Sequence, residues 1–363
     1  MSYSVCVYAI CKNEEAFVSR FMEGAKEADC VVVLDTGSTD HTVSALQKAG
    51  AMVYSQHISP WRFDSARNAS LALVPEYIDI CVCVDLDEVF HPGWRQALEM
   101  AWQNDTGKAR YRYTWSFTPE GKEGVVFWIE KAHRRHGYLW SHPVHEILQW
   151  CGEGREPPTI TVEGMQLDHH PDATKSRGQY LPLLELSVAE CPTDDRNMHY
   201  LGREYMYAGR LDEAISTLLR HLALPSATWA DERCASMRYI AKCYLALEND
   251  KEAQRWLLRA IAEAPYLREP WLDYALLAYK MQAWHLLVWL TEQALAIKTR
   301  PTTYITEAES WGALPYDLAS LGYFYLGAYE KAHVAIKSAL ALSQTDTRLK
   351  QNLAIIETHL PSP

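Results

Sequence analysis

Short apolar runs alternate with helix-like segments through the first half of the chain. Four runs with the near-continuous apolar character of buried parallel strands lie at residues 4–10, 30–34, 51–54 and 80–84. Three segments whose apolar residues recur at helical spacing lie between them, at residues 14–28, 42–49 and 63–73. This alternation predicts an α/β domain with a mostly parallel, doubly wound sheet and helices on both faces.

Beyond residue 87 the pattern changes to strand-like pieces that are rich in aromatic residues. They lie at residues 110–117, 124–129, 144–150 and 159–167. We expect these pieces to form an antiparallel extension of the sheet that shapes a pocket for an acceptor.

The second half of the chain repeats with a longer period. Three pairs of small or apolar residues lie 34 residues apart, namely Ala241 and Ala275, Ala253 and Leu287, and Ala260 and Ala294. This is the period of the tetratricopeptide repeat, in which paired helices stack into an α-solenoid. We expect about four helix pairs over residues 194–360, with longer connections at 226–233 and 299–315. The predicted domains are therefore an α/β domain at residues 1–175 and an all-α solenoid at residues 176–363.

The composition describes an ordinary folded protein of 363 residues, 48% hydrophobic and 22% charged, which is long enough for about two domains. A formal net charge of −11 weighs against a nucleic-acid backbone as partner. The nine cysteines lack a paired CxxC spacing, which favours reduced thiols. Because no apolar stretch reaches the roughly 18 residues of a membrane span and the N-terminus lacks a signal-peptide pattern, we expect no membrane span and a cytoplasmic location.

Two acids one residue apart follow the fourth predicted strand. Asp85 and Asp87 come at the end of the apolar run 80–84, which places them at the carboxyl edge of the sheet, where open α/β folds bind ligands. Acids of this kind hold a divalent cation against a phosphate. The sequence therefore predicts a metal and diphosphate site at this edge.

Two further polar groups lie near the predicted strands. Asp35 follows the second strand in the turn DTGSTD, where its carboxylate is available to a base or ribose, whereas Asp40 is expected to cap the next helix. Arg67 lies on the third predicted helix, and its guanidinium suits the bidentate binding of phosphate oxygens. A solvent-exposed arginine is the alternative.

Four segments together resemble the family 2 glycosyltransferases of the GT-A fold: SVCVYAICKNEE, VVVLDTGSTDHT, WRFDSARNASLAL and CVCVDLDEVF. The segments HPVHEIL and LDHHPDATKSRGQYLPLLE, followed by the repeats, make the whole layout similar to bacterial and phage glycosyltransferases with such an array. The resemblance implies a Rossmann-like GT-A domain and an inverting transfer from a nucleotide sugar, with a UDP-sugar favoured as the donor.

The resemblance also implies which residues bind the donor. The end of the first strand, including Ala9 and Cys11, and Asp35 are expected to line the nucleotide pocket, and Arg67 to lie beside the diphosphate. Many family members have two acids in the motif after the second strand, but here Thr36 follows Asp35, so the choice of base stays open.

By the same resemblance, Asp85 and Asp87 are the DxD pair. The first acid of such a pair contacts ribose or metal-bound water, and the second coordinates Mn²⁺ or Mg²⁺, which offsets the charge on the leaving diphosphate. In several GT-A enzymes a late histidine completes the metal shell. We expect His169 rather than His170 to take this place, with a helix-capping or core role as the alternative for both.

An inverting transfer needs a base on the acceptor side. Glu146, in the segment SHPVHE, is the first candidate for this catalytic role, and His145 is its rival. The alternative is that the two residues form a buried, hydrogen-bonded strut under the pocket. Among the aromatic residues, Trp140 is the one whose position near His145 suggests stacking on a sugar.

Three functions compete at this point. The first is an active glycosyltransferase whose repeats present or select an acceptor, and the second is an interaction or scaffold protein with an inactive GT-A domain. The third, a nucleotidyltransferase, is disfavoured because the chain lacks a glycine-rich loop for a triphosphate. The acceptors considered are a peptide or protein, a saccharide or lipid, and, less favoured by the acidic balance, a modified nucleotide in phage DNA. A repeat array also needs a capped end, which a homodimer would supply.

Overall fold

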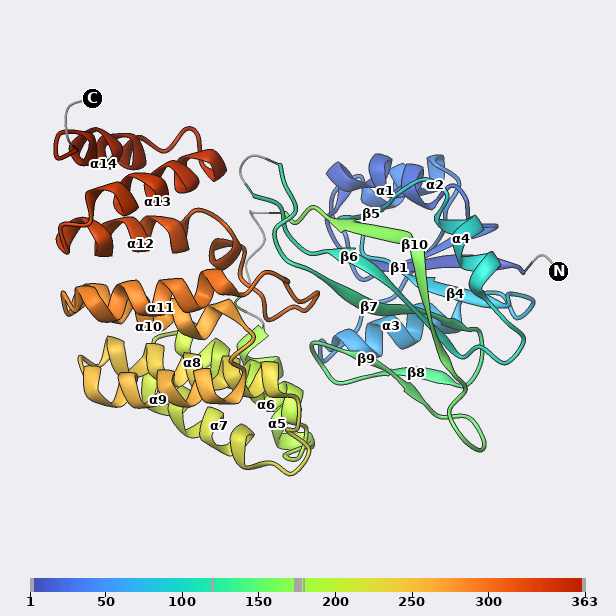
Figure 1. The fold of residues 1–363 in the computed structure, drawn as a ribbon. Helices are drawn as coiled ribbons and strands as arrows, with labels where there is room; N and C mark the ends of the chain where they lie inside the picture. The colour runs from blue at the N-terminus through green and yellow to red at the C-terminus, as the bar shows by residue number, and fades with distance from the viewer. Residues whose placement is uncertain (1–2, 119–120, 173–177, 179, 361–363) are drawn as a thin grey trace. The chain divides into compact units, whose positions relative to one another are not determined.

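The computed structural model describes residues 3–118, 121–172, 178 and 180–360. The contacts divide the chain into two compact units, with the division after Glu190 (Figure 1). The predicted domain boundary between residues 175 and 176 lies outside the described residues. Helix α5 (Tyr180–Glu190) is part of the first unit.

A sheet of eight strands forms the centre of the first unit, in the order β3-β2-β1-β4-β7-β6-β10-β5 over the described residues. Its strands are β1 (Val5–Cys11), β2 (Cys30–Asp35), β3 (Met52–Ser55), β4 (Ile80–Cys83), β5 (Glu88–Phe90), β6 (Lys108–Thr114), β7 (Val126–Arg134) and β10 (Thr159–His169). The strands β3, β2, β1 and β4 run parallel, as the four apolar runs predict. The predicted mostly parallel α/β class is therefore confirmed.

The extension of the sheet is mixed rather than antiparallel. β7 pairs antiparallel with β4 and with β6, as predicted, but β10 runs parallel to β6. The predicted strand 144–150 leaves this sheet altogether: β8 (Tyr138–Ser141) and β9 (Ile147–Trp150) form a separate antiparallel hairpin. The apolar side chains of this hairpin pack on one face of the main sheet, which explains why its residues resemble those of a sheet strand.

Helices α1, α2 and α4 lie on one face of the sheet of the first unit, and α3 with the β8-β9 hairpin lies on the other (Figure 1). The helical elements are η1 (Glu15–Phe17), α1 (Val18–Ala25), α2 (Thr42–Lys48), α3 (Phe63–Ala72) and α4 (Trp94–Ala101). Val5, Val7 and Ala9 of β1 pack with α1, α2 and α4, whereas Cys6 and Tyr8 pack on the opposite face with α3 and the β8-β9 hairpin. Because both faces are covered, all of β1 is buried, and its sequence is a continuous apolar run.

A chain of buried hydrogen bonds joins β8, β1 and β7. The indole Nε1 of Trp140 donates to the Tyr8 hydroxyl over 2.7 Å, and Tyr8 lies 2.8 Å from Nε2 of His133. Nδ1 of His133 lies 2.8 Å from the carbonyl oxygen of Arg134. Since an indole only donates and a carbonyl only accepts, His133 is neutral, with its proton on Nδ1. Burial lowers the pKa of His133 to about 4.

The same hairpin is tied to α3 through one side chain. Asn68 donates from Nδ2 to the carbonyl of Trp140 and accepts at Oδ1 from the backbone N–H of Trp140, both over 2.8 Å. The backbone N–H of Phe63 also donates to the carbonyl of Pro143 over 3.0 Å. Helix α3 therefore fixes the segment that leads from β8 towards Glu146.

The regular elements of the second unit are all helices over residues 191–360, as the repeat period predicts. In the described part of this unit four pairs follow one another, with α14 after them: α6 (Asp195–Tyr207) and α7 (Leu211–Ala223), α8 (Ala230–Ala246) and α9 (Asp250–Glu263), α10 (Arg268–Lys280) and α11 (Trp284–Ala296), α12 (Leu314–Tyr325) and α13 (Tyr329–Leu342), α14 (Thr347–Glu357). A short 3-10 turn, η2 (Ala308–Trp311), precedes α12. The predicted all-α tetratricopeptide-repeat class is confirmed.

Small residues let neighbouring helices of the second unit approach closely, within one pair at Gly202 and between two successive pairs at Gly322. A Cβ atom on Gly202 would lie 2.5 Å from Cγ of Leu218, and one on Gly322 would lie 2.7 Å from Cγ2 of Val288. A side chain at either position would push its neighbour aside, which accounts for the glycine that follows a leucine at residues 201–202 and again at 321–322. Within the described residues, no helix is both long and apolar enough to cross a membrane.

We expect acid to destabilise the first unit through His133. Its folded pKa is about 4 and its unfolded pKa about 6.5, so between these values the unfolded chain binds a proton that the folded chain does not. Stability contributed by the neutral ring is therefore lost as the pH falls through this window, by about 2 kcal/mol between pH 7 and pH 5. Urea unfolding at the two pH values measures the difference. His133→Gln, which does not titrate, should reduce it by that amount, and an unchanged difference would contradict this assignment.

Candidate functional site

The candidate site lies at the carboxyl ends of the parallel strands. From β1 the chain moves to β2 and β3 on one side, and then crosses to β4 on the other side of β1. In open α/β sheets such a change of direction leaves a crevice at the carboxyl ends of the strands, where ligands bind. Asp35 ends β2, and Asp85 follows β4, so the two acids flank this crevice.

Asp35 organises the turn that follows β2. Its carboxylate accepts hydrogen bonds from the backbone N–H of Gly37 over 3.2 Å and of Ser38 over 3.0 Å. Gly37 has a φ of +116°, a conformation that side chains other than hydrogen rarely allow. Asp35 is buried, with 4% of its surface exposed, so the turn backbone already uses both of its oxygens. The N-cap residue of the next helix is His41 rather than the predicted Asp40, and the Asp40 carboxylate accepts from the backbone N–H and the hydroxyl of Thr42, the first residue of that helix.

The end of β1 is held against the same turn. Thr36 donates from its hydroxyl to the carbonyl of Cys11 over 3.0 Å, and the Cys11 thiol lies 3.8 Å from Asp35. Burial, helped by the nearby Asp35 carboxylate, raises the pKa of the Cys11 thiol above its usual range. Ala9 has no exposed surface, and its carbonyl accepts a hydrogen bond from Ser70. Cys11 therefore lies at the crevice, whereas Ala9 supports it from below.

Arg67 joins two of the predicted site residues. It lies on α3 with 5% of its surface exposed, and its Nη2 lies 2.9 Å from Oδ1 of Asp85. Its Nε forms an ion pair with Oε1 of Glu146. Burial opposes the charge, but Asp85 and Glu146 outweigh it and raise the pKa of Arg67 above its ordinary value. The structure thus brings Arg67, Asp85 and Glu146 together, and Arg67 is occupied by these carboxylates rather than exposed to solvent.

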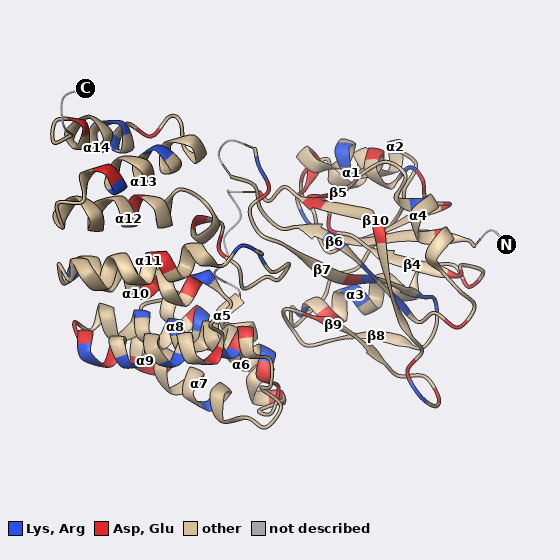
Figure 2. Ribbon diagram, viewed as in Figure 1, with Lys and Arg blue, Asp and Glu red and all other residues tan. Residues whose placement is uncertain are grey.

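A second buried cation, which the sequence analysis missed, holds Asp85 from the other side. Nζ of Lys131 on β7 lies 3.1 Å from Asp85 and 2.8 Å from Glu88. Glu88 also accepts from the Tyr113 hydroxyl over 2.7 Å and from the backbone N–H of Asp85 over 2.8 Å. Burial opposes ionisation of Asp85, but Arg67 and Lys131 hold its pKa below its usual range. Figure 2 shows basic and acidic segments side by side around α3 and β7.

A shift in strand register explains why Lys131 is hard to find in the sequence. Ala109 of β6 faces Ala132 of β7, but Tyr111 faces Ile129, so β7 contains one extra residue between these pairs. Such a bulge redirects side chains and breaks the simple alternation of a strand. The only sequence signal is a lysine, preceded by a glutamate, among the apolar residues of the segment FWIEKA.

Asp87 and His169 form a second pair at the edge. Oδ2 of Asp87 lies 3.4 Å from Nε2 of His169, and both side chains are largely buried. Burial lowers the pKa of His169, but the hydrogen bond and charge of Asp87 outweigh it, so the net pKa is raised. His170 lies apart, with its ring stacked on Phe117 at 5.2 Å, and contacts Asp87 through backbone atoms alone among the bonds described. His169 is therefore the histidine that faces Asp87.

Asp87 and His169 are the two predicted metal ligands that the structure brings together. Nδ1 of His169 lies 3.0 Å from the carbonyl of Trp115, so a neutral ring with its proton on Nδ1 would offer its Nε2 lone pair to a cation beside Asp87, as is typical of metal-bound histidines. Over the described residues, no group of three or more His, Cys, Asp or Glu side chains is arranged to hold a metal. A cation with only two protein ligands completes its shell with water and substrate phosphates, which suits Mn²⁺ or Mg²⁺.

The region of the predicted base is largely buried. The Glu146 side chain is 11% exposed and paired with Arg67. His145 has a φ of +51°, and its ring centroid lies 6.0 Å from that of Tyr180 on α5. The expectation that Trp140 stacks on a sugar is wrong, because Trp140 is 5% exposed and its indole is bonded to Tyr8 in the core.

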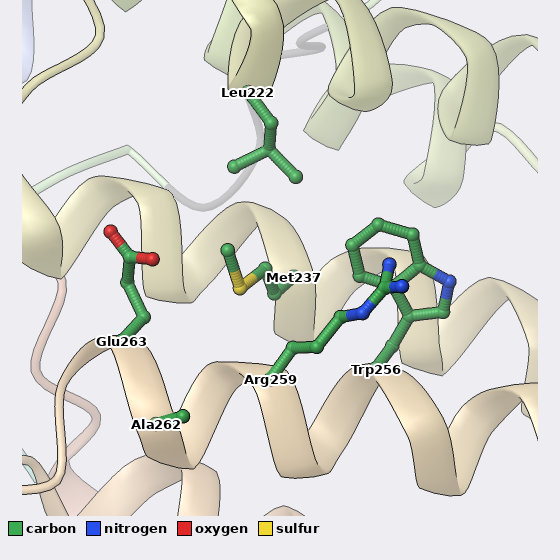
Figure 3. Close-up of a pocket in the computed structure, with 6 residues that line it drawn as sticks. All are labelled: Leu222, Met237, Trp256, Arg259, Ala262 and Glu263. Carbon is green, nitrogen blue, oxygen red and sulfur yellow. The ribbon is translucent and has the colours of Figure 1, made fainter.

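A separate pocket in the second unit has no catalytic character. It lies between α7, α8 and α9 and is lined by Leu222, Met237, Trp256, Arg259, Ala262 and Glu263 (Figure 3). Arg259 lies over the Trp256 ring at 4.5 Å, and the acid, Glu263, is paired with Arg233 over 2.6 Å. Its charged groups are thus engaged with neighbouring side chains.

Comparisons with known proteins give different matches for the two units. Residues 6–143 match the family described as Glycosyl transferase family 2. No curated protein matches the sequence.

Solved structures match over about half of the chain. A chain of the APC/C hetero-tetramer Cut9-Hcn1 is 17% identical over 50% of this chain and 33% of that one, with a TM-score of 0.40. A thermophilic TPR protein of Thermus thermophilus is 17% identical over 50% of this chain and 92% of that one, with a TM-score of 0.37. PilF of Pseudomonas aeruginosa is 13% identical over 48% and 72%, with a TM-score of 0.39. This chain thus spans a third of the Cut9-Hcn1 chain it matches.

The bridge made by Arg67 predicts a non-additive effect on stability. Arg67→Met should lower the free energy of unfolding by about 3–5 kcal/mol, because it leaves Asp85 and Glu146 without their shared cation. Adding Glu146→Gln removes one of these carboxylates, so the double variant should lose about 1–3 kcal/mol less than the sum of the two single changes. Urea unfolding of the four proteins measures this coupling. Strictly additive losses would show that Arg67 does not bridge the two acids.

Proposed function

The first unit carries a domain of glycosyl transferase family 2 at residues 6–143, joined to a tetratricopeptide-repeat array, and from this we propose a specific enzyme activity. The chain is an inverting, metal-dependent glycosyltransferase that moves a sugar from a nucleotide-sugar donor, a UDP-sugar first, to an acceptor. The observation that carries the proposal is the Asp87 and His169 pair beside the charged cluster around Asp85 at the crevice.

The charge balance at the crevice supports the need for a metal. Two cations, Arg67 and Lys131, lie among three carboxylates, Asp85, Glu88 and Glu146, which leaves one net negative charge. The carboxylates already neutralise both cations, so these cations cannot also balance the negative charge of a donor diphosphate. A divalent cation held by Asp87 and His169 would supply the missing positive charge and stabilise the diphosphate as it leaves.

The donor-binding roles follow from position. Asp35 and Cys11 lie at the carboxyl ends of β2 and β1, where the base and ribose of the donor would bind, and Ala9 supports that strand end. Arg67 and Lys131 hold the Asp85 carboxylate in a fixed, ionised form. We assign Asp85 to ribose or to metal-bound water. Arg67 acts through this carboxylate and orients it.

Glu146 is our candidate for the base that takes the acceptor proton, with His145 as the second candidate. Arg67 holds the carboxylate of Glu146 in one orientation, and a fixed carboxylate next to the donor site suits proton transfer to the side chain. The repeat array would help to select the acceptor, either a peptide or protein or a saccharide, since such arrays present extended binding surfaces.

Donor binding is the first test of the metal site. Calorimetric titration with UDP, GDP and their sugar conjugates, with Mn²⁺ and with chelator, should show metal-dependent binding of one nucleotide. Asp87→Asn and His169→Gln should each weaken it at least tenfold, since each removes one of two protein ligands. Asp168→Asn is the matched control, because Asp168 is the neighbour of His169 on β10 and is paired with His91 over 2.8 Å. Failure of every nucleotide to bind would contradict the proposal and favour a scaffold with an inactive domain.

The role of Glu146 is tested by a change that keeps its shape. Glu146→Gln can still accept a hydrogen bond from Arg67 but is a very weak base. If Glu146 is the base, kcat should fall about 10²–10⁴-fold while KM for the donor stays similar. Glu146→Asp, which keeps the carboxylate, should recover part of the lost rate. A near-normal kcat for Glu146→Gln would show that Glu146 is not the base and has a structural role. The second candidate, His145, would then be tested with His145→Gln.

A further inference from the structure

One cation at the edge of the crevice takes no part in the ion pairs described above. Arg20 lies in the first turn of α1, which follows the end of β1 after a short connection. Its Nη2 donates over 2.7 Å to the carbonyl of His170, the residue that directly follows β10. The guanidinium of Arg20 therefore lies at the carboxyl edge of the sheet, where the candidate site is.

A short backbone link connects Arg20 to the two predicted metal ligands. The backbone N–H of His170 donates to the carbonyl of Asp87 over 2.8 Å, while the carbonyl of His170 accepts from Arg20. His170 also follows His169 directly in the chain. A single residue thus separates Arg20 from both members of the Asp87 and His169 pair, beside which the diphosphate of the donor is expected to bind.

Two contacts fix the orientation of this guanidinium. Its Cζ lies 4.5 Å from the centroid of the Phe17 ring, and its Nη2 is held by the carbonyl of His170. Phe17 in turn packs against the apolar core of the first unit. Because the arginine is already held in place, it loses little side-chain freedom when an anion binds, which favours affinity.

Arg20 keeps most of its hydrogen-bonding capacity for a ligand. Over the part of the chain that the structure describes, its side chain makes the one hydrogen bond to His170 and no ion pair. Its Nε is buried and has no hydrogen-bond partner in this part of the chain. A buried donor without an acceptor is unfavourable, so a ligand oxygen that accepted a hydrogen bond from Nε would remove this cost.

The other two cations of the site differ from Arg20 in this respect. Arg67 and Lys131 are both paired with Asp85, and each is paired with one further carboxylate. Their charges are therefore neutralised before any ligand arrives. Arg20 has no carboxylate partner among the described residues, so its charge is available to an anion.

The proposed reaction supplies an anion at this edge. When the bond between the anomeric carbon of the sugar and the diphosphate oxygen breaks, the diphosphate keeps the electron pair, and its negative charge grows. A cation placed beside the diphosphate stabilises this charge. A guanidinium also matches phosphate oxygens in geometry, because its N–H groups form a planar fork that can donate two parallel hydrogen bonds.

We propose that Arg20 binds the diphosphate of the nucleotide-sugar donor and stabilises it as it leaves. Phosphate oxygens accept hydrogen bonds from the guanidinium, whose orientation Phe17 and His170 fix. The inference rests on the proposed function, because it names a further residue that binds the donor of that reaction. A purely structural Arg20 would instead only hold the backbone of His170.

Binding of a nucleoside diphosphate and of its parent nucleoside, both with Mn²⁺ present, tests the proposal on the full chain. The probes are UDP and uridine, or GDP and guanosine if the chain binds GDP. Arg20→Met should weaken diphosphate binding about 10–100-fold in calorimetric titration, because it removes hydrogen bonds to a charged group. Nucleoside binding, followed by ligand-observed NMR, should stay unchanged, because the nucleoside has no phosphate.

Two further variants control for charge and for folding. Lys26→Met removes one positive charge at the other end of the same helix, where Lys26 is paired with Glu23, and should leave both affinities unchanged. Arg20→Lys keeps the charge but lacks the planar fork, so it should weaken diphosphate binding several-fold, less than Arg20→Met does. If Arg20→Met does not fold, an unchanged diphosphate affinity in Arg20→Lys overturns the proposal.

The outcomes separate this proposal from the proposed function. If the wild-type chain binds a nucleoside diphosphate, equal losses for the diphosphate and the nucleoside, or no loss for either, would show that Arg20 does not bind the diphosphate. If the wild-type chain binds no nucleotide, the proposed function is contradicted, and pyrophosphate with Mn²⁺ becomes the probe for Arg20. Pyrophosphate binding that Arg20→Met weakens would support a diphosphate site at Arg20, and absence of such binding would overturn it.

Discussion

Two buried cations hold the functional edge of the first unit together. Arg67 comes from α3 and Lys131 from β7, and both reach Asp85, which follows β4. Arg67 also binds Glu146, so a helix, two sheet strands and the segment after β8 are linked through Arg67 and Asp85. Charges buried at this depth are costly unless each is paired, and breaking one pair leaves the others uncompensated. Each of these elements is therefore held at the crevice by ion pairs with side chains of the other elements.

The sequence predicts those parts of the site that follow from strand order. A continuous apolar run followed by acids places Asp35 and Asp85 at the carboxyl edge, and the structure has them there. The partners of these acids depend on contacts between distant segments and on a bulge, which no periodicity reports, so Lys131 was missed and the pairing of Arg67 was not foreseen. Trp140 was misread for a similar reason, because its hydrogen bond to Tyr8 is formed across 132 residues of chain.

In the second unit, too, the sequence predicts the local helices but not the contacts between segments that are distant in the chain. The 34-residue spacing of small residues predicts the helix pairs, since it reports how closely successive helices pack. A long connection at residues 299–315 is also visible in the sequence. Its contacts are not, because Tyr304 reaches Glu232 and Tyr200, which lie far back in the chain. Composition alone cannot distinguish such a bound connection from one surrounded by solvent.

The two hydrogen bonds between Asn68 and Trp140 have a consequence for the behaviour of the whole protein. A hairpin of two strands has two edges, and each free edge offers unpaired N–H and C=O groups to any other extended chain. Asn68 takes one N–H and one C=O of β8 with the pattern that a neighbouring strand would use. The side chain of Asn68 thus occupies the hydrogen-bonding groups that another strand would need at this edge of β8. At this position it protects the hairpin against edge-to-edge aggregation.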